Sequence, residues 1–131
     1  MHISSKTYYG IKALSCLALS DTSMSIKEIS EKEAIPEEYL GKIFQKLRQA
    51  GFVLSKRGLN GGYVLAHNPK EISLVDIFSE LEGSFFNIPC FETEGCKKES
   101  SCQTKDLWKN INETVNRSLS RISLHDIISF S

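Results

Sequence analysis

Three regularly spaced cysteines are the residues of this sequence best suited to chemistry. Cys90, Cys96 and Cys102 are separated by five residues each. Six positions along an α-helix turn through about 600°, which would point the sulfurs apart. Along a strand, neighbouring sulfurs would lie roughly 20 Å apart. Only an irregular loop lets all three converge, and the intervening Pro89, Gly95 and polar residues are typical of one.

Converging thiolates favour a soft metal or an iron–sulfur cluster. The five residues between successive cysteines are more than the roughly two to four that usually separate the cysteines of a structural zinc site. An odd number of clustered cysteines also argues against simple disulfide pairing. We therefore expect Cys90, Cys96 and Cys102 to hold a 2Fe–2S or 4Fe–4S cluster, with three unrelated surface thiols as the alternative. Cys16 lies in a helical apolar pattern and is expected to be a small buried hydrophobe.

The basic residues are unevenly distributed, although the 131-residue chain has 16 basic and 16 acidic residues. No Asp or Glu occurs between Glu38 and Glu71. Such a window favours a docking face for a polyanion, with a solvated helix face as the alternative. The basic side chains in it are Lys42, Lys46, Arg48, Lys56, Arg57 and Lys70.

The composition, 40% hydrophobic and 24% charged, predicts a folded, soluble domain. No long apolar run is present, so we expect neither a signal peptide nor a membrane-spanning helix. The expected location is the cytoplasm, where the cysteines would be thiols or ligands and not disulfides.

The elements that must position these residues follow from periodicity and from helix start and stop signals. Ser25 and Glu28 form a capping box, Pro36 suits a first helical position, and Gly51 suits a helix end. Positive-φ residues between two β-prone runs predict a hairpin. Helices are expected over residues 4–20, 25–33, 36–50, 73–82, 104–121 and 123–128, strands over 52–56 and 62–66, and an aperiodic loop over 84–103.

This order predicts a mostly α protein with a small β-hairpin: a winged helix-turn-helix followed by a long helix. Three regions are expected: a DNA-binding domain over 1–83, a cluster-binding loop over 84–103, and a dimerisation helix with a C-terminal helix over 104–131. The long helix has one apolar stripe that needs a partner, either a second chain or the rest of its own. The stripe consists of Leu107, Ile111, Val115 and Leu119.

Two elements could touch nucleic acid. A recognition helix presents its first turns to the major groove, where Lys42 and Lys46 suit phosphate or guanine and Glu38 suits cytosine N4. Tyr39 could reach a phosphate or pack partly into the core. At the hairpin tip, Arg57 among glycines suits an A·T-rich minor groove, with an ordinary glycine-rich hairpin as the alternative.

The chain resembles the Rrf-type family of bacterial winged helix-turn-helix transcription regulators, the IscR/NsrR-like group, from Ile3 to Ile128. Besides the three cysteines, the resemblance rests on Ile29-Ser30-Glu31, Tyr39-Leu40, Phe44, Leu47-Arg48, Gly51 and the run Arg57-Gly58-Leu59-Asn60-Gly61-Gly62-Tyr63. It implies a homodimer, joined along the long helix, on a palindromic operator of double-stranded DNA. It also implies an iron–sulfur cofactor on the cysteines, base reading by Glu38, Tyr39, Gly41 and Lys42, and a minor-groove contact by Arg57, beside Gly61 of the same motif.

The sequence departs from this family pattern at three positions. A glutamate that helps to choose between operator classes is replaced by Gly41. Lys105 stands where some members have a ligand histidine three residues after the third cysteine. Tyr8 stands where others have a ligand aspartate. The fourth cluster ligand is therefore open, and Asp106, His2, Glu92, Glu94 or an exogenous small molecule are candidates.

The sequence predicts a non-enzymatic DNA-binding transcription regulator whose operator affinity depends on an iron–sulfur cluster. One alternative is a family regulator without a cluster, gated by thiol oxidation, zinc or a partner protein. Another is a small electron-transfer or redox enzyme. Against that enzyme, the sequence shows no nucleotide-binding glycine loop and no His/Asp/Ser constellation.

Overall fold

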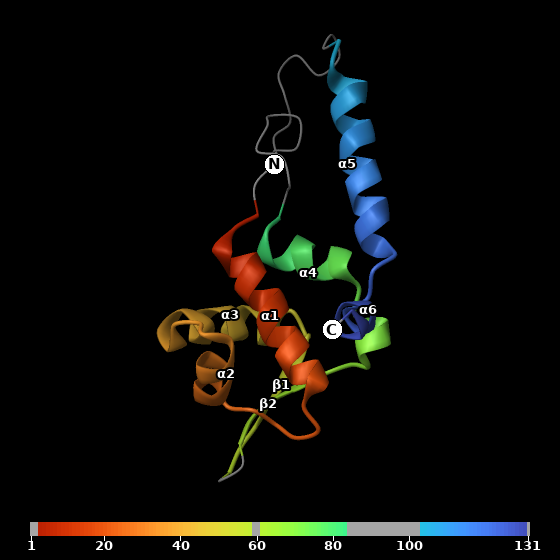
Figure 1. Cartoon of the computed structure of the whole chain (residues 1–131). Helices are drawn as coiled ribbons and strands as arrows, with labels where there is room; N and C mark the ends of the chain where they lie inside the picture. The colour runs from red at the N-terminus through yellow and green to blue at the C-terminus, as the bar shows by residue number, and fades with distance from the viewer. Residues whose placement is uncertain (1–2, 59–60, 84–102, 131) are drawn as a thin grey trace.

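The computed structural model describes residues 3–58, 61–83 and 103–130. Helices α1 to α4 pack together and the two-stranded hairpin projects from one side of them (Figure 1). α5 stands beside α4 and runs back toward the body of the fold, where α6 follows. The predicted fold class is confirmed. In chain order the elements are α1 (Ser5–Leu19), α2 (Ile26–Glu33), α3 (Glu37–Gln49), β1 (Val53–Lys56), β2 (Gly62–Leu65), the short 3-10 helix η1 (Pro69–Glu71), α4 (Leu74–Leu81), α5 (Lys105–Ser120) and α6 (Leu124–Ser129).

The helix boundaries follow the predicted caps closely. Ser25 and Glu28 form the capping box of α2, and Ser73 accepts a hydrogen bond from the backbone N–H of Val75 at the start of α4. The prediction that Pro36 is the first helical residue is wrong. Its ψ of 128° is extended, so it is the N-cap residue of α3. Ala34, left-handed at φ 56°, turns the chain between α2 and α3.

The apolar faces of α1, α2, α3, α4 and α6 meet in one core. α6 reaches this core because the backbones of residues 72–74 and 122–124 pair: Leu74 N–H donates to Ile122 O at 2.8 Å, and Leu124 N–H donates to Ile72 O at 2.9 Å. Cys16 is buried as predicted, and burial raises the pKa of its thiol. The fully buried large side chains include Leu14, Ile29, Leu40, Ile43, Phe44, Leu47, Ile77 and Leu124.

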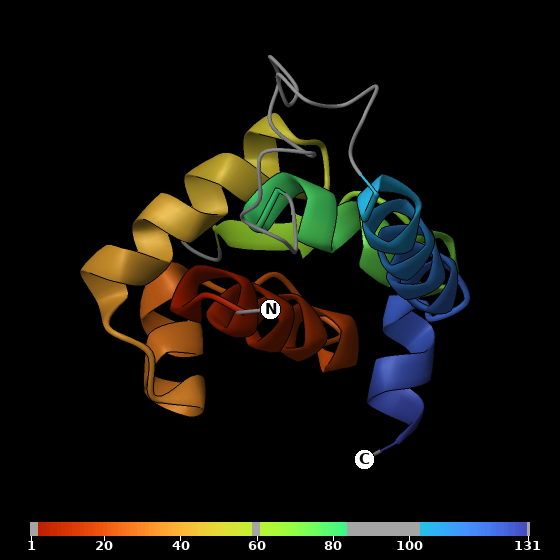
Figure 2. The same cartoon turned by 90° about the horizontal axis from the view of Figure 1, so that it is seen from above.

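α5 differs from the other long helices because none of its residues is buried in the single chain. It contacts α4 and extends beyond the rest of the described fold (Figure 1), and seen from above it stands on the opposite side of α1 from α3 (Figure 2). Leu107 is 52% exposed, and Ile111 and Val115 are half-buried. The apolar stripe predicted from the sequence is therefore only partly covered by the described residues.

Candidate nucleic-acid interface

Helix α3 is held by one face and presents the other to solvent. Leu40, Ile43, Phe44 and Leu47 are buried against α1, α2 and the hairpin. On the outer side, Glu38 and Lys42 are exposed and Lys46 is half-buried. These three residues follow one another at intervals of four, which places them along one side of the helix. The arrangement suits an element that lies in the major groove.

Tyr39 is at the edge of this surface. Its ring packs edge-on against Tyr9 of α1, with the ring centres 5.7 Å apart and the planes at 82°. The residue is half-buried, and its ring packs against the core. The partial core packing considered from the sequence therefore describes the ring of Tyr39.

Gly41 lies on α3 one residue before Lys42. It is half-buried, yet a Cβ built at this position would meet no atom within 4 Å, the backbone of its own helix left aside. Packing within the chain therefore does not require a glycine here. A side chain at position 41 would have free space beside the exposed residues of α3.

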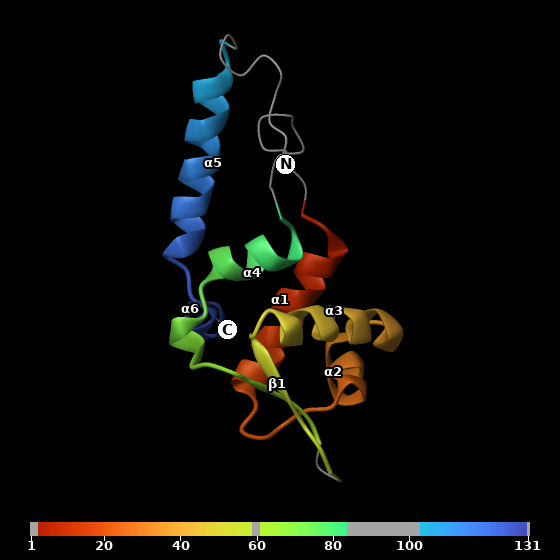
Figure 3. The ribbon, with the colours of Figure 1, turned by 180° about the vertical axis from the view of Figure 1, so that it is seen from behind.

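The hairpin is fixed to the rest of the fold by backbone and aromatic contacts. Met24 and Tyr63 exchange two backbone hydrogen bonds, of 3.1 and 2.7 Å, so the segment before α2 pairs with β2. The Tyr63 ring lies 4.6 Å from that of Phe44 in α3. These contacts set the direction of the wing relative to α3, and Figure 3 shows β1 starting near the end of α3 and the hairpin extending away from the helices.

At the tip of the wing, Lys56 and Arg57 are exposed. Gly61 N–H donates to Gly58 O at 2.9 Å. A Cβ on Gly61 would come within 2.7 Å of Lys56 O, so a larger residue would push the backbone apart. Gly61 thus keeps the hairpin narrow next to Arg57.

The basic side chains of this surface have no acidic partners among the described residues. Lys12 of α1 lies 4.0 Å from Glu33, but within the described part of the chain Lys42, Lys46, Lys56 and Arg57 form no ion pair. We call these four residues the cationic strip. Unpaired cations on two rigidly connected elements suit a row of phosphates.

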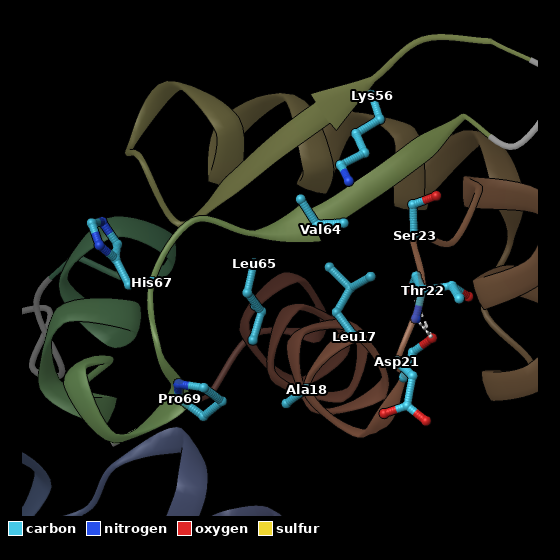
Figure 4. A pocket seen from close by; sticks show the side chains of 11 residues that line it. Leu17, Ala18, Asp21, Thr22, Ser23, Lys56, Val64, Leu65, His67 and Pro69 are labelled. Carbon is cyan, nitrogen blue, oxygen red and sulfur yellow. Dashed lines mark hydrogen bonds between the residues drawn. The ribbon is translucent and has the colours of Figure 1, made fainter.

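A shallow pocket of about 310 Å³ lies behind the wing. Leu17 and Ala18 of α1 point toward Val64 and Leu65 of β2, and Lys56 and Asp21 lie at its rim (Figure 4). The facing apolar side chains belong to the packing of the wing on α1. This packing of β2 on α1 therefore helps to position the wing, with Lys56 at the rim of the pocket.

The proposed cluster ligands Cys90, Cys96 and Cys102 lie outside the described residues, as do the candidates His2, Glu92 and Glu94. The candidate Asp106 lies in the first turn of α5. At the two positions where family members have other ligands, Lys105 begins α5 and Tyr8 is 58% exposed with its ring against Tyr9. The described ranges contain no group of three or more His, Cys, Asp or Glu that could hold a metal.

A polar junction between the start of α1 and the end of α4 was not predicted from the sequence. Glu82 accepts hydrogen bonds from the side chains of Ser4 and Thr7, and Thr7 is completely buried. The sequence signal that could have indicated a buried polar contact is Thr7, a polar residue on the inward, apolar face of α1. Its partner could not be found, because the two residues are 75 positions apart.

A three-helix unit with a wing, an exposed outer face on its third helix and unpaired cations defines a winged helix-turn-helix regulator of transcription. Residues 3–129 match the Rrf2 family, described as an iron-dependent transcriptional regulator, and the chain belongs to this family. The helices of the described ranges are too short or too polar to cross a bilayer.

Similar proteins include the transcriptional regulator IscR of Aliivibrio salmonicida, 34% identical over 98% of this chain and 77% of that protein. Among solved structures, CymR, the global cysteine regulator of B. subtilis, has a TM-score of 0.80 and 33% identity, covering 100% of this chain and 98% of that one. T. potens IscR has a TM-score of 0.79 and 32% identity, covering 98% and 87%. The resemblance inferred from the sequence is confirmed.

Proposed function

We propose that this regulator binds palindromic operator DNA as a homodimer and that an iron–sulfur cluster on Cys90, Cys96 and Cys102 sets its affinity. The DNA-binding part of the proposal rests on the cationic strip, whose four cations lie on two connected elements and form no ion pair within residues 3–58, 61–83 and 103–130. The regular spacing of the three cysteines carries the cluster part. The proposed regions are a reading head over 1–83, a cluster segment over 84–103 and a pairing segment over 104–131.

In the proposed complex, α3 lies in the major groove. Lys42 and Lys46 contact phosphates or guanine, and Glu38 accepts from cytosine N4. Tyr39 has its ring fixed against Tyr9, so only its hydroxyl end is available for a phosphate. Gly41 lets the α3 backbone approach the bases closely, because no side chain intervenes.

The wing reads the adjacent minor groove. Arg57 enters it, where A·T-rich sequence makes the potential most negative. Gly61 keeps the tip of the hairpin narrow enough to enter the minor groove behind Arg57, since a Cβ at position 61 would meet the backbone oxygen of Lys56. Two heads on one dimer then place two such pairs of contacts on a palindrome.

The pairing segment supplies the dimer. A helix of 16 residues with no buried side chain leaves its apolar stripe available to a second copy of the chain. Joining the copies along α5 covers Leu107, Ile111 and Val115 without using α3 or the wing. The free surface of the head then faces the operator.

The donor set fits the cluster chemically. Thiolates are the usual ligands of iron–sulfur clusters, and Cys16, buried and with a raised pKa, is unsuited to join them. The fourth ligand stays open, with Asp106, His2, Glu92, Glu94 or an exogenous small molecule as the candidates. When bound, a cluster supplies a centre that reacts with oxygen or nitric oxide or is lost when iron is scarce.

The decisive experiment compares the wild-type protein with a variant in which Cys90, Cys96 and Cys102 are all serine. After anaerobic purification, the wild type is expected to be coloured and to contain iron and acid-labile sulfide, and its operator affinity should change when the cluster is removed. The triple variant should be colourless and insensitive to the same treatment. Cys16→Ala is the matched control and should retain the cluster. A triple variant that responds like the wild type would refute the proposal.

A second candidate is a regulator without a cluster, gated by thiol oxidation, zinc or a partner protein. The similarity to CymR, a cysteine regulator, equals that to T. potens IscR, with TM-scores of 0.80 and 0.79. Anaerobic protein free of iron and sulfide, whose operator affinity still changes when its thiols are oxidised, would favour this candidate.

A further inference from the structure

One carboxylate joins the two ends of the reading head. Glu82, at the end of α4, accepts three hydrogen bonds on the same oxygen, Oε2. The donors are the backbone N–H of Ser4 at 3.0 Å, the Ser4 hydroxyl at 2.9 Å and the Thr7 hydroxyl at 2.5 Å. We call this arrangement the Glu82 junction.

The junction is built into the fold and is not a chance surface contact. Thr7 has an exposed fraction of 0% and is the buried polar residue of the described core. A carboxylate beside the first turn of α1 is also favoured by the positive end of that helix. Hydrogen bonds to an ionised acceptor are stronger than neutral ones, so the start of α1 and the end of α4 should move together.

The same part of α1 contacts the proposed recognition helix. Tyr9 packs edge-on against Tyr39 of α3. At Gly10 the three helices meet without spare room: a Cβ there would overlap Leu81 Cδ1 of α4 and lie 3.6 Å from Ile43 Cγ2 of α3. Close-packed interiors transmit strain, so these contacts provide a route by which a displacement of the end of α4 would reach α3 through α1.

Glu82 is also the second residue before the segment, starting at 84, that contains the three cysteines. We propose that Glu82 is a positioning residue that carries the state of the cysteine segment to α3 through Ser4 and Thr7. This inference rests on the proposed function, since it assumes that the segment has two states. The two arrangements of α1, α3 and α4 that Glu82 would link need to differ only slightly in free energy for the state of the segment to select one of them.

The test uses the full-length protein and a palindromic operator, with affinity measured by fluorescence anisotropy in the cluster-loaded and cluster-free states. The readout is the ratio of the two dissociation constants. Glu82→Gln and Thr7→Val should each move this ratio toward one, by at least about fivefold if the junction carries a typical coupling. Thr7→Ser keeps the hydroxyl and should retain the wild-type ratio. Glu80→Gln, an exposed glutamate on the same helix, is the control and should change nothing.

Thermal unfolding of every variant separates coupling from stability. A lower melting temperature with an unchanged ratio would make the junction purely structural and overturn the inference. Should Glu82→Gln fail to fold, the Thr7→Val and Thr7→Ser pair gives the same decision. A wild-type ratio of one would instead overturn the proposed function, and the relay with it. A wild-type ratio far from one that survives in Thr7→Val would overturn the relay alone.

Discussion

Helices α3 and α5 are both amphipathic and of similar length, with 13 and 16 residues, but they are used in opposite ways. α3 buries Leu40, Ile43, Phe44 and Leu47 within its own chain, whereas α5 buries no residue. An apolar stripe is the same signal in both helices, so the stripe alone does not tell which surface covers it. The apolar face of α3 is buried within its own chain. We propose that the apolar stripe of α5 is buried by a second copy of the chain.

The largest expected effect is on the interior of the head. Phe44→Ala removes a fully buried ring that packs against Tyr63, and should lower the free energy of unfolding by about 3–5 kcal/mol. Urea denaturation followed by circular dichroism measures this change. Phe130→Ala, at a ring that is 81% exposed, is the matched control and should cost less than about 0.5 kcal/mol. Equal losses would contradict the assignment of the core.

The next effect concerns α5. Val115→Asp puts a charge on the apolar stripe and should convert the proposed dimer into a monomer, which sedimentation velocity detects. Loss of the second head should weaken operator binding by about a hundredfold or more, since two-site avidity is lost. Asn110→Asp adds the same charge at an exposed position of α5 and should leave the dimer intact. A Val115→Asp protein that still dimerises would place the interface elsewhere.

A smaller effect is expected at the wing. Arg57→Ala should weaken operator binding by roughly tenfold or more and relax the preference for A·T-rich sequence, because a cation in the minor groove is lost. The free energy of unfolding should not change, since Arg57 is exposed and forms no ion pair among the described residues. Anisotropy titrations at several salt concentrations measure the effect. Lys70→Ala is the control, a basic residue outside the cationic strip, and an equal loss there would remove the role assigned to Arg57.

Two glycines in the head give effects of opposite sign. Gly41→Ala should stabilise the fold by about 0.5–1 kcal/mol, since alanine favours the helix and no neighbouring atom obstructs it. Gly10→Ala makes the same helical gain but should still destabilise the fold, because the new methyl group overlaps the buried Leu81 side chain and overpacking costs about 1–3 kcal/mol. Thermal unfolding of both variants checks the signs. A destabilised Gly41→Ala protein would show that α3 is packed more tightly than described.

The smallest effect is a pH dependence at α6. Hydrogen bonds from the backbone N–H and hydroxyl of Ser123 lower the pKa of Asp126 from its ordinary 3.8. A lowered pKa means that the stabilisation is present above pH 3.8 and is lost as the pH falls through the lower folded value. Unfolding should therefore become easier on acidification below pH 3.8. Asp126→Asn should flatten this part of the profile, and an unchanged slope would argue against the cap.

Local signals predicted the elements because the interactions that create them are local. Ser25 with Glu28, Ser123 with Asp126, and Gly51 at a φ of +87° mark helix ends through neighbours a few residues away. The predicted and observed ends of the elements differ by about one position, as at Pro36, since proline is tolerated both as the N-cap and as the first helical residue. The stretch of basic residues from 42 to 57 was also predicted, because the charge of a side chain follows directly from its residue type.

Long-range partners were out of reach of the same reasoning. Nothing in the sequence near Thr7 points to Glu82, and nothing near Met24 points to Tyr63, because each pair is created by the packing of distant segments. Tyr39 shows the same limit: its position on α3 was evident, but its ring orientation depends on Tyr9.

The sequence by itself determined the order of the helices, the wing and the positions of the charges, since periodicity, caps and turn residues act over one or two turns of chain. The tertiary structure alone decided that the wing is tied to α3 through Tyr63, that α4 is tied to α1 through Glu82, and that the described residues cover the apolar stripe of α5 only in part. These outcomes depend on which surfaces meet in three dimensions, where hydrogen bonds and close packing join residues far apart in the chain.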